Sequence, residues 1–402
     1  MSSKTRTNVK HIYSITLYIL LLANTASAQQ LTLRDTLDAA LEHQVNLSEI
    51  NNANSQDITQ ALGWLDGAPT VSALYLHSQT DMGTNEAELS LSLPIKSQVR
   101  KDLERNLKNS SEAIATSAQN QLALYYSGFI RELIWQHESE KAMLNATMRK
   151  ARLLENLLIQ YKQLSELSAL PQYALYLLQK EMNDTQILLM QYKRNMANIL
   201  MQYFTLTGLK YFPESITEAL PTTPFDSLSR HPDIQALDAT WVAFQQSVSG
   251  QTKAAQPWSM QFTARRIEAF EFSENQIGIG VDVPLNVGES LSAEQQSEYG
   301  RTKLSYEVER SKRLGILFNT TQVQTSEHTF LLQKQQILDA SVDTLDALQA
   351  SITLMLESNA DNQVVHIRNM MELIDAQEQI TLNQIAIQQQ IANIRQAAGL
   401  TL

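Results

Sequence analysis

The chain has 402 residues and no cysteine, which excludes disulfide bridges, thiolate metal sites and a lipid anchor on an N-terminal cysteine. Its 42 acidic residues outnumber its 31 basic residues. This acidic balance argues against nucleic acid and anionic lipid headgroups as main partners, because both select basic surfaces.

Residues 1–28 have the layout of a secretory signal. Three basic residues precede an apolar run over residues 12–22, and an Ala-Ser-Ala sequence at 26–28 offers a cleavage site. An uncleaved anchor is the alternative, but the run is shorter than the ~20 residues that span a bilayer. We therefore expect the mature chain to start at Gln29.

Four short segments alternate apolar and polar residues, as a strand with one apolar face does. Residues 87–93 and 277–283 show this most clearly, and each has a partner upstream, at 71–78 and 258–265. The connections have the length of hairpin turns. The positions expected to form the apolar face include Leu89, Leu91, Leu93, Trp258, Met260, Phe262, Ile277, Ile279 and Val281.

Long stretches between these strands lack helix breakers. Proline is absent from residues 95–170 and 285–402, and Gly128 is the only glycine at 95–206. Alternating three- and four-residue apolar steps over residues 175–203 favour coiled packing. A helix of ~70 residues would reach ~100 Å, so we expect a rod or tube. The amide-rich positions at 377–393 are expected to face water.

The same order of elements occurs twice: helix, strand hairpin, long helix, tight tip and return helix. Pro94 corresponds to Pro284, and Gly208 corresponds to Gly399. The boundary is the proline-bearing polar stretch at 212–230. We therefore expect three parts, the signal at 1–28, a first repeat at 29–213 and a second repeat at 214–402.

Four strands cannot close on themselves, and strand edges cannot face lipid. Because the smallest membrane barrels have about eight strands, closure needs at least two copies, and three copies would give twelve strands. The alternative is a soluble sheet that packs against the helices.

Several short motifs occur in order and in duplicate. They are Leu31-Thr32-Leu33, Asn46-Leu47, Ser90-Leu91, Pro94-Ile95, His231-Pro232-Asp233-Ile234, Val281, Pro284-Leu285 and the run from Met371 to Gln377. Together they resemble the TolC-type outer-membrane efflux proteins, over essentially all of Gln29 to Leu402. The stretch from Trp64 to Ile95 resembles the branch that is paired with heavy-metal cation pumps.

This resemblance implies a mainly α fold in which long coiled helical hairpins form a periplasmic tube. Four β-strands per subunit would contribute to a trimeric, twelve-stranded barrel in the outer membrane. The subunit would be a passive, gated exit duct that docks a periplasmic adaptor (membrane fusion) protein and an inner-membrane pump of the RND type. No cofactor is implied. The glycine that is usual near each helical tip in this family is missing here.

The two tips differ in chemistry. The first is apolar and hydroxyl-rich, which suits adaptor contact, and comprises Leu164, Ser165, Glu166, Leu167 and Ser168. The second suits a hydrated periplasmic gate and includes Glu357, Ser358, Asn359 and Asp361. In a trimer its carboxylates would form rings of three, whereas the alternative is a solvated helix end.

Signals of catalysis or metal binding are missing from the sequence. The histidines are scattered, and no phosphate-binding glycine loop or nucleophile elbow occurs. Nine methionines in the helical stretches could suggest soft-metal handling, but filling of a helical core explains most of them. We expect neither an enzyme nor a metal site.

Two other classes have long helices. A coiled-coil spacer or adhesin stalk of the cell envelope would need only the helical pattern, so the duplicated strand hairpins argue against it. A periplasmic adaptor would need a lipoyl-like strand-rich domain, and none is evident. The sequence leaves the exported cargo open.

Overall fold

The computed structural model describes residues 31–44, 63–80, 82–166, 172–253, 258–284, 292–357 and 363–402. The predicted signal segment lies outside the described residues. The chain divides into two compact units, the first comprising Met1–His43, Glu132–Glu218 and Leu402 and the second Gln44–Arg131 and Ala219–Thr401. The prediction of a mainly α fold with four strands is confirmed.

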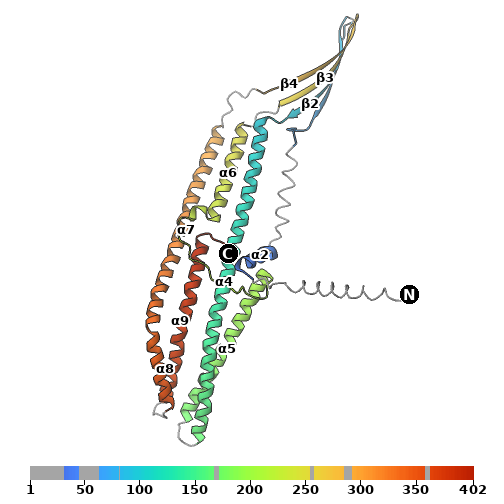
Figure 1. Ribbon diagram of the computed structural model, residues 1–402. Coiled ribbons are helices and arrows are strands. Elements are labelled where there is room, and N and C mark those ends of the chain that lie inside the picture. Colours follow the sequence, from blue (N-terminus) through green and yellow to red (C-terminus); the bar gives the residue numbers. More distant parts are fainter. Residues whose placement is uncertain are drawn as a thin grey trace, which may run out of the picture. The chain divides into compact units, whose positions relative to one another are not determined.

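The first unit is helical. It contains α2 (Leu33–Gln44), the part of α4 (Gln98–Glu166) from Glu132 onward, and α5 (Gln172–Thr207), which lies beside α4 (Figure 1). Its core joins Leu133 of α4 to Ile199 and Tyr203 of α5, both of which lie on the predicted apolar stripe. The Asn195 amide donates a hydrogen bond to the Glu140 carboxylate at 3.2 Å, a second link between the two helices.

The second unit combines helices with a sheet. Its helices are the first part of α4, η1 (Leu228–Arg230), α6 (Pro232–Lys253), α7 (Ala293–Ala340), α8 (Val342–Glu357) and α9 (Gln363–Ala397). Helix α9 packs on α7 through buried amides. Asn383 Nδ2 donates to the Leu331 carbonyl at 3.0 Å, and Gln390 Nε2 donates to the Gln324 carbonyl at 2.8 Å. Both amides are buried, so the expectation that this amide-rich face meets water is wrong at these positions.

The four strands form one antiparallel sheet in the order β1 (Thr70–Leu76), β2 (Asn85–Ile95), β3 (Trp258–Glu268) and β4 (Ser273–Asp282). The two hairpins predicted from the sequence are present. They are joined to each other by β2 and β3, which pair over their full lengths and come from the two halves of the chain. The sheet is therefore one surface built from both hairpins.

A glycine closes the return helix in each half. Gly208 follows α5 with φ 71°, and Gly399 follows α9 with φ 78°, a left-handed conformation that favours glycine. Each glycine also lies against a histidine. A Cβ atom on Gly208 would lie 3.1 Å from His43 Cδ2, and one on Gly399 would lie 2.6 Å from His231 Cδ2. The same local arrangement thus occurs once in each unit, while the division into domains at residue 213 stays a prediction.

Candidate functional site

One face of the sheet is apolar except near the hairpin turns, where it carries Arg266 and Asn275. The register places residues directly opposite one another in rows that share a face. These rows are Val71, Leu91, Phe262 and Ile279; Ala73, Leu89, Ala264 and Ile277; Leu93, Met260 and Val281; and Ile95 with Trp258. All nine residues predicted for the apolar face therefore lie on the same side.

The other face is polar along most of its length. From the helix-connected end toward the hairpin turns, its rows are Pro94, Ser259 and Asp282; Thr70, Ser92, Gln261 and Gly280; Ser72, Ser90, Thr263 and Gly278; Leu74, Glu88, Arg265 and Gln276; and Leu76, Glu86, Ile267 and Glu274. Hydrogen bonds cross the strands on this side. The Ser72 and Ser90 hydroxyls are 2.7 Å apart, and Gln261 Nε2 donates to Asp282 Oδ2 at 2.8 Å.

The apolar face is the more exposed of the two. Along most of β3 the apolar-face residues are no better covered than their polar neighbours. On β4, Ile277 is 90% exposed and Ile279 is 72% exposed. A soluble sheet with one covered face shows the reverse, because its apolar side packs on a core. This exposure argues against the alternative of a soluble sheet packed on the helices.

Both edges of the sheet are open. Because the order is serial, β1 and β4 each have a partner strand on one side only among the described residues. An edge strand offers a row of unpaired backbone donors and acceptors, which is a template for pairing with another chain. The sheet thus combines an uncovered apolar face with two edges that are able to pair.

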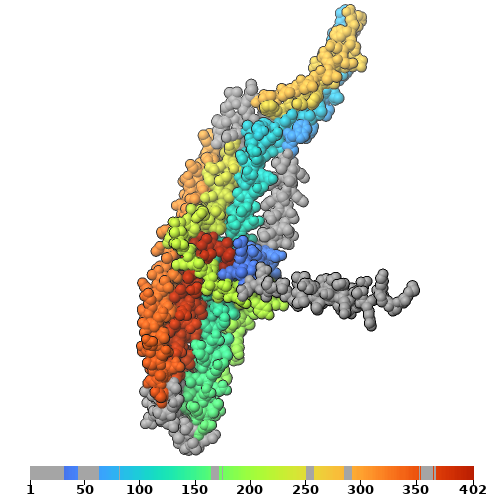
Figure 2. Space-filling model, in the orientation of Figure 1, coloured from blue at the N-terminus to red at the C-terminus, as the bar shows by residue number. Residues whose placement is uncertain are grey.

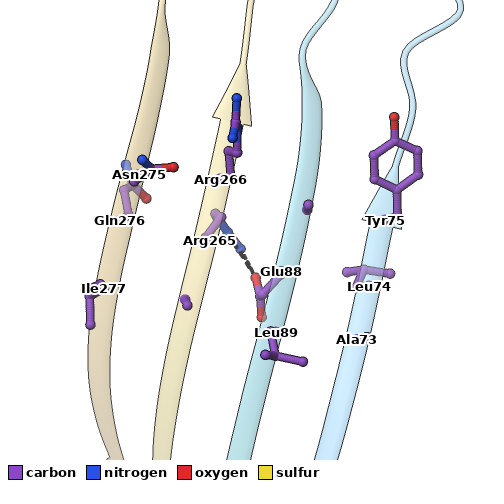
Figure 3. Close-up of a pocket in the computed structure, with 12 residues that line it drawn as sticks. Ala73, Leu74, Tyr75, Glu88, Leu89, Arg265, Arg266, Asn275, Gln276 and Ile277 are labelled. Carbon is purple, nitrogen blue, oxygen red and sulfur yellow. Dashed lines mark hydrogen bonds and ion pairs between the residues drawn. The ribbon is translucent and has the colours of Figure 1, made fainter.

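Near the hairpin turns the polar face carries a charged pair that the sequence did not indicate. Arg265 Nη2 is 2.6 Å from Glu88 Oε2, and Arg265 Nε donates to the same oxygen at 2.9 Å (Figure 3). The pair borders a hollow of about 550 Å³ that is lined by Leu74, Gln276 and other residues of all four strands. Alternation placed each charge on the polar side, but it could not show that β2 and β3 are neighbours.

The predicted tip and gate residues are mostly outside the described residues. Leu164, Ser165 and Glu166 are the last three residues of α4, whereas Leu167 and Ser168 lie beyond it. Glu357 is the last residue of α8, and Ser358, Asn359 and Asp361 fall in the undescribed segment that follows. Their roles stay predictions.

Two histidines in the described part of the chain, His137 and His231, serve structural contacts. His137 lies 3.3 Å from Glu138 and tilts against the ring of Phe212, and a hydrogen bond from His137 lowers the pKa of Glu138. Burial lowers the pKa of His231, whose Nδ1 accepts the backbone N–H of Asp233 at 3.2 Å. Within the described ranges, no three His, Asp or Glu side chains group as metal ligands.

The exposure of the methionines tests whether they fill the helical core. Of the helical methionines, Met370 is buried, while Met190 and Met201 are 64% and 65% exposed, so core filling does not account for the latter two.

In the described segments, every helix is too short or too polar to cross a membrane.

No protein-family model matches the chain, and no curated protein does. Several solved structures match the chain. CusC, in crystal structures that concern folding and transmembrane channel formation, is 11% identical and has a TM-score of 0.65, with 92% of each chain covered. The outer membrane protein VceC from Vibrio cholerae is 12% identical with a TM-score of 0.67, and the match covers 92% of this chain and 96% of VceC.

The open state of the MtrE outer membrane channel from Neisseria gonorrhoeae is a third match. It is 12% identical with a TM-score of 0.60, and the match covers 92% of this chain and 89% of MtrE. At these identities the likeness concerns the fold. The long helices and the four-stranded antiparallel sheet of this chain therefore form the fold seen in CusC, VceC and MtrE.

Proposed function

We propose that the chain is an outer-membrane channel subunit of the TolC type, the passive exit duct of a tripartite efflux pump. The observation that carries this proposal is the sheet, with its exposed apolar face, polar opposite face and two open edges. Lipid is the environment in which an exposed apolar face is stable, provided that no strand edge remains unpaired.

Copies of this sheet can pair with one another. Strand direction alternates along the serial order, so β4 of one copy runs antiparallel to β1 of the next. Two copies would give eight strands, which enclose an interior just wide enough for side chains. Three copies would give twelve strands, and this is the smallest assembly that leaves a duct. The polar face would then line water and the apolar face would meet lipid.

The helices would extend the duct into the periplasm. Their ends at Glu166 and Glu357 are where we place the two tips, the first for docking the adaptor and the second for the gate. The adaptor and an inner-membrane pump of the RND type are inferred from the resemblance to TolC-type proteins. The likeness of the fold to outer-membrane channels supports the same assignment. The subunit itself performs no chemical step.

The proposal is tested by isolating the mature chain from outer membranes in detergent and measuring its mass and its conductance in planar bilayers. A matched pair on β4 tests the faces, because Ile279 and Gly278 are adjacent and point to opposite sides. A lysine at the lipid midplane costs roughly 2 to 4 kcal/mol, so Ile279→Lys should sharply reduce insertion. Gly278→Lys meets open space and should insert.

A monomer with intact β-structure would contradict the channel. Equal losses of membrane insertion in the two lysine variants would also contradict it. Only a sheet with one face in lipid makes a lysine on that face more costly than a lysine on the other face.

The tips are tested separately. Replacing Glu357 and Asp361 with Gln and Asn should change conductance and leave adaptor cross-linking intact, and Leu167→Asp should do the reverse. If both changes abolish cross-linking and leave conductance as it was, both tips are docking surfaces.

A further inference from the structure

A band of charge crosses the polar face beside the hairpin turns. We propose that the Arg265–Glu88 pair forms the charge-selective constriction at the outer mouth of the duct, and that Arg265 limits the preference of the duct for cations. This inference rests on the proposed function, because the polar face encloses a lumen only when the sheet closes into a barrel.

The pair is held in place from two strands. Arg265 on β3 contacts Glu88 on β2 through Nε and Nη2, and its Nη1 is 3.9 Å from Oε2 of Glu86. The side chains are 42% exposed for Arg265 and 23% for Glu88, so water and ions can reach them. Two hydrogen bonds to one carboxylate oxygen fix the guanidinium across the strands, where it cannot swing freely into the lumen.

Side-chain size along the polar face places the constriction in the two rows nearest the hairpin turns, which are the row of the pair and the row of Leu76, Glu86, Ile267 and Glu274. The next two rows toward the helices contain Ser72, Ser90, Thr263 and Gly278, and Thr70, Ser92, Gln261 and Gly280. Most of these are small. The row of the charged pair also contains Leu74 and Gln276. Each of its four side chains is larger than the side chain on the same strand in the next row toward the helices. The width of a barrel's backbone is set by its strands, and therefore the longer side chains narrow the lumen here.

Apart from Asp282, which lies at the helix-connected end of the polar face, the charges fall in the same place. The two rows of small residues carry no charged side chain. The row of the pair and the last row before the turns carry Glu86, Glu88 and Glu274 against Arg265, which is three negative charges and one positive, or −2 per copy. Three copies would place a net charge of −6 around the mouth of the duct. Rings of charged side chains select ions by sign, so the mouth should favour cations, and removal of Arg265 would make the charge more negative, at −9.

The test compares Arg265→Gln with Arg266→Gln in planar bilayers, with single-channel conductance and reversal potential in a KCl gradient as the readouts. Arg266 is the matched control because it is the next residue, lies on the apolar side and pairs with Glu268 at 2.6 Å. Arg265→Gln should raise conductance and increase the ratio of K⁺ to Cl⁻ permeability by about twofold or more, since it widens and further charges the ring. Arg266→Gln should change neither.

Two further variants keep the inference falsifiable if Arg265→Gln fails to assemble. Glu88→Gln removes one negative charge per copy and should shift the permeability ratio toward Cl⁻, whereas Arg265→Lys should keep the wild-type ratio. Equal behaviour of the Arg265 and Arg266 variants in a conducting trimer would overturn the inference and leave the proposed function standing. A wild-type chain that forms no conducting oligomer would overturn both.

Discussion

At the residue scale, the glycines that close the two return helices bear most directly on stability. Gly399→Ala should destabilise the protein strongly, because a left-handed residue with a Cβ atom costs roughly 1 to 2 kcal/mol and the new atom would also meet His231. Gly208→Ala should have a smaller effect, since its nearest contact is longer. Thermal unfolding in detergent, followed by circular dichroism, measures both changes.

Gly300→Ala is the control for these two variants. Gly300 lies inside α7, and a Cβ atom added to it would have no described atom within 4 Å outside its own stretch of helix, so alanine should stabilise the helix by about 0.5 to 1 kcal/mol. If all three variants shifted the melting temperature in the same direction, the left-handed closure would not be the cause.

His231 gives the second unit a pH dependence. Burial lowers its pKa from the usual 6.5, and its neutral Nδ1 accepts the N–H of Asp233 at the start of α6. As the pH falls below about 6.5, the unfolded chain takes up this proton before the folded chain does, so the contribution of His231 to stability is present above that pH and is lost on acidification.

The melting temperature of the wild type should therefore fall between pH 7.5 and pH 5.5. The melting temperature of the His231→Asn variant should fall by less over the same pH range, because asparagine can cap the helix without titrating. Parallel pH series of the two proteins decide the matter, and an equal fall would assign the pH dependence to other groups.

At the element scale, α7 presents an apolar stripe that the described residues of its own unit leave uncovered. Ile316, Val323, Phe330 and Ile337 recur every seven residues and are each at least 55% exposed. Figure 2 shows the lower part of α7, in orange, at the surface in view. A seven-residue repeat is the spacing with which one helix packs along another, so we expect a helix of a second copy to lie on this stripe.

Val323→Glu should weaken the association of copies and leave the helix content unchanged. Gln322→Glu is the control, because Gln322 is also exposed but lies off the stripe. Analytical ultracentrifugation in detergent measures the fraction of trimer. Equal dissociation by the two glutamates would mean that added charge, and not the stripe, is responsible.

The elements also show what the sequence could and could not predict. The faces of the sheet were predictable from residues such as Leu91 and Ile279, because side chains in a strand alternate with a period of two. The contact between β2 and β3 was not predictable, since alternation does not say which strand lies beside which. Strand β2 was expected over residues 87–93, yet it runs from Asn85 to Ile95, with Pro94 opposite Ser259.

The helices illustrate a second limit. The absence of proline, with Gly128 the only glycine, predicted a long helix, and α4 runs for 69 residues. The burial of Asn383 and Gln390 was not predicted. The polarity of an amide suggests water as its partner, but here the carbonyl groups of the facing helix α7 accept the hydrogen bonds.

At the scale of the whole molecule, the lack of cysteine allows a direct test of closure. Ser72→Cys on β1 can be combined in turn with Gln276→Cys, Gly278→Cys or Gly280→Cys on β4, and each pair would supply the only two thiols of the chain. Within one copy β1 and β4 are separated by two strands, so a disulfide must join different copies.

Oxidation of at least one pair should give dimer and trimer bands and nothing larger. The expected limit of three follows from a ring, in which every β4 edge finds a β1 edge. A ladder that continued past three would indicate an open filament, and the absence of any cross-link in all three pairs would contradict edge pairing.

The pairing of β2 with β3 also affects the order in which the chain can fold. Glu88 and Arg265 are 177 residues apart, and the long helices of the first half lie between them in sequence. Closing so long a loop is slow compared with forming helices, whose contacts are local. The first hairpin must therefore wait, with one apolar side and an unpaired edge, until the second half has been exported. During this interval it is the segment most exposed to aggregation, and a chaperone that covers strand edges would protect the nascent chain at this point.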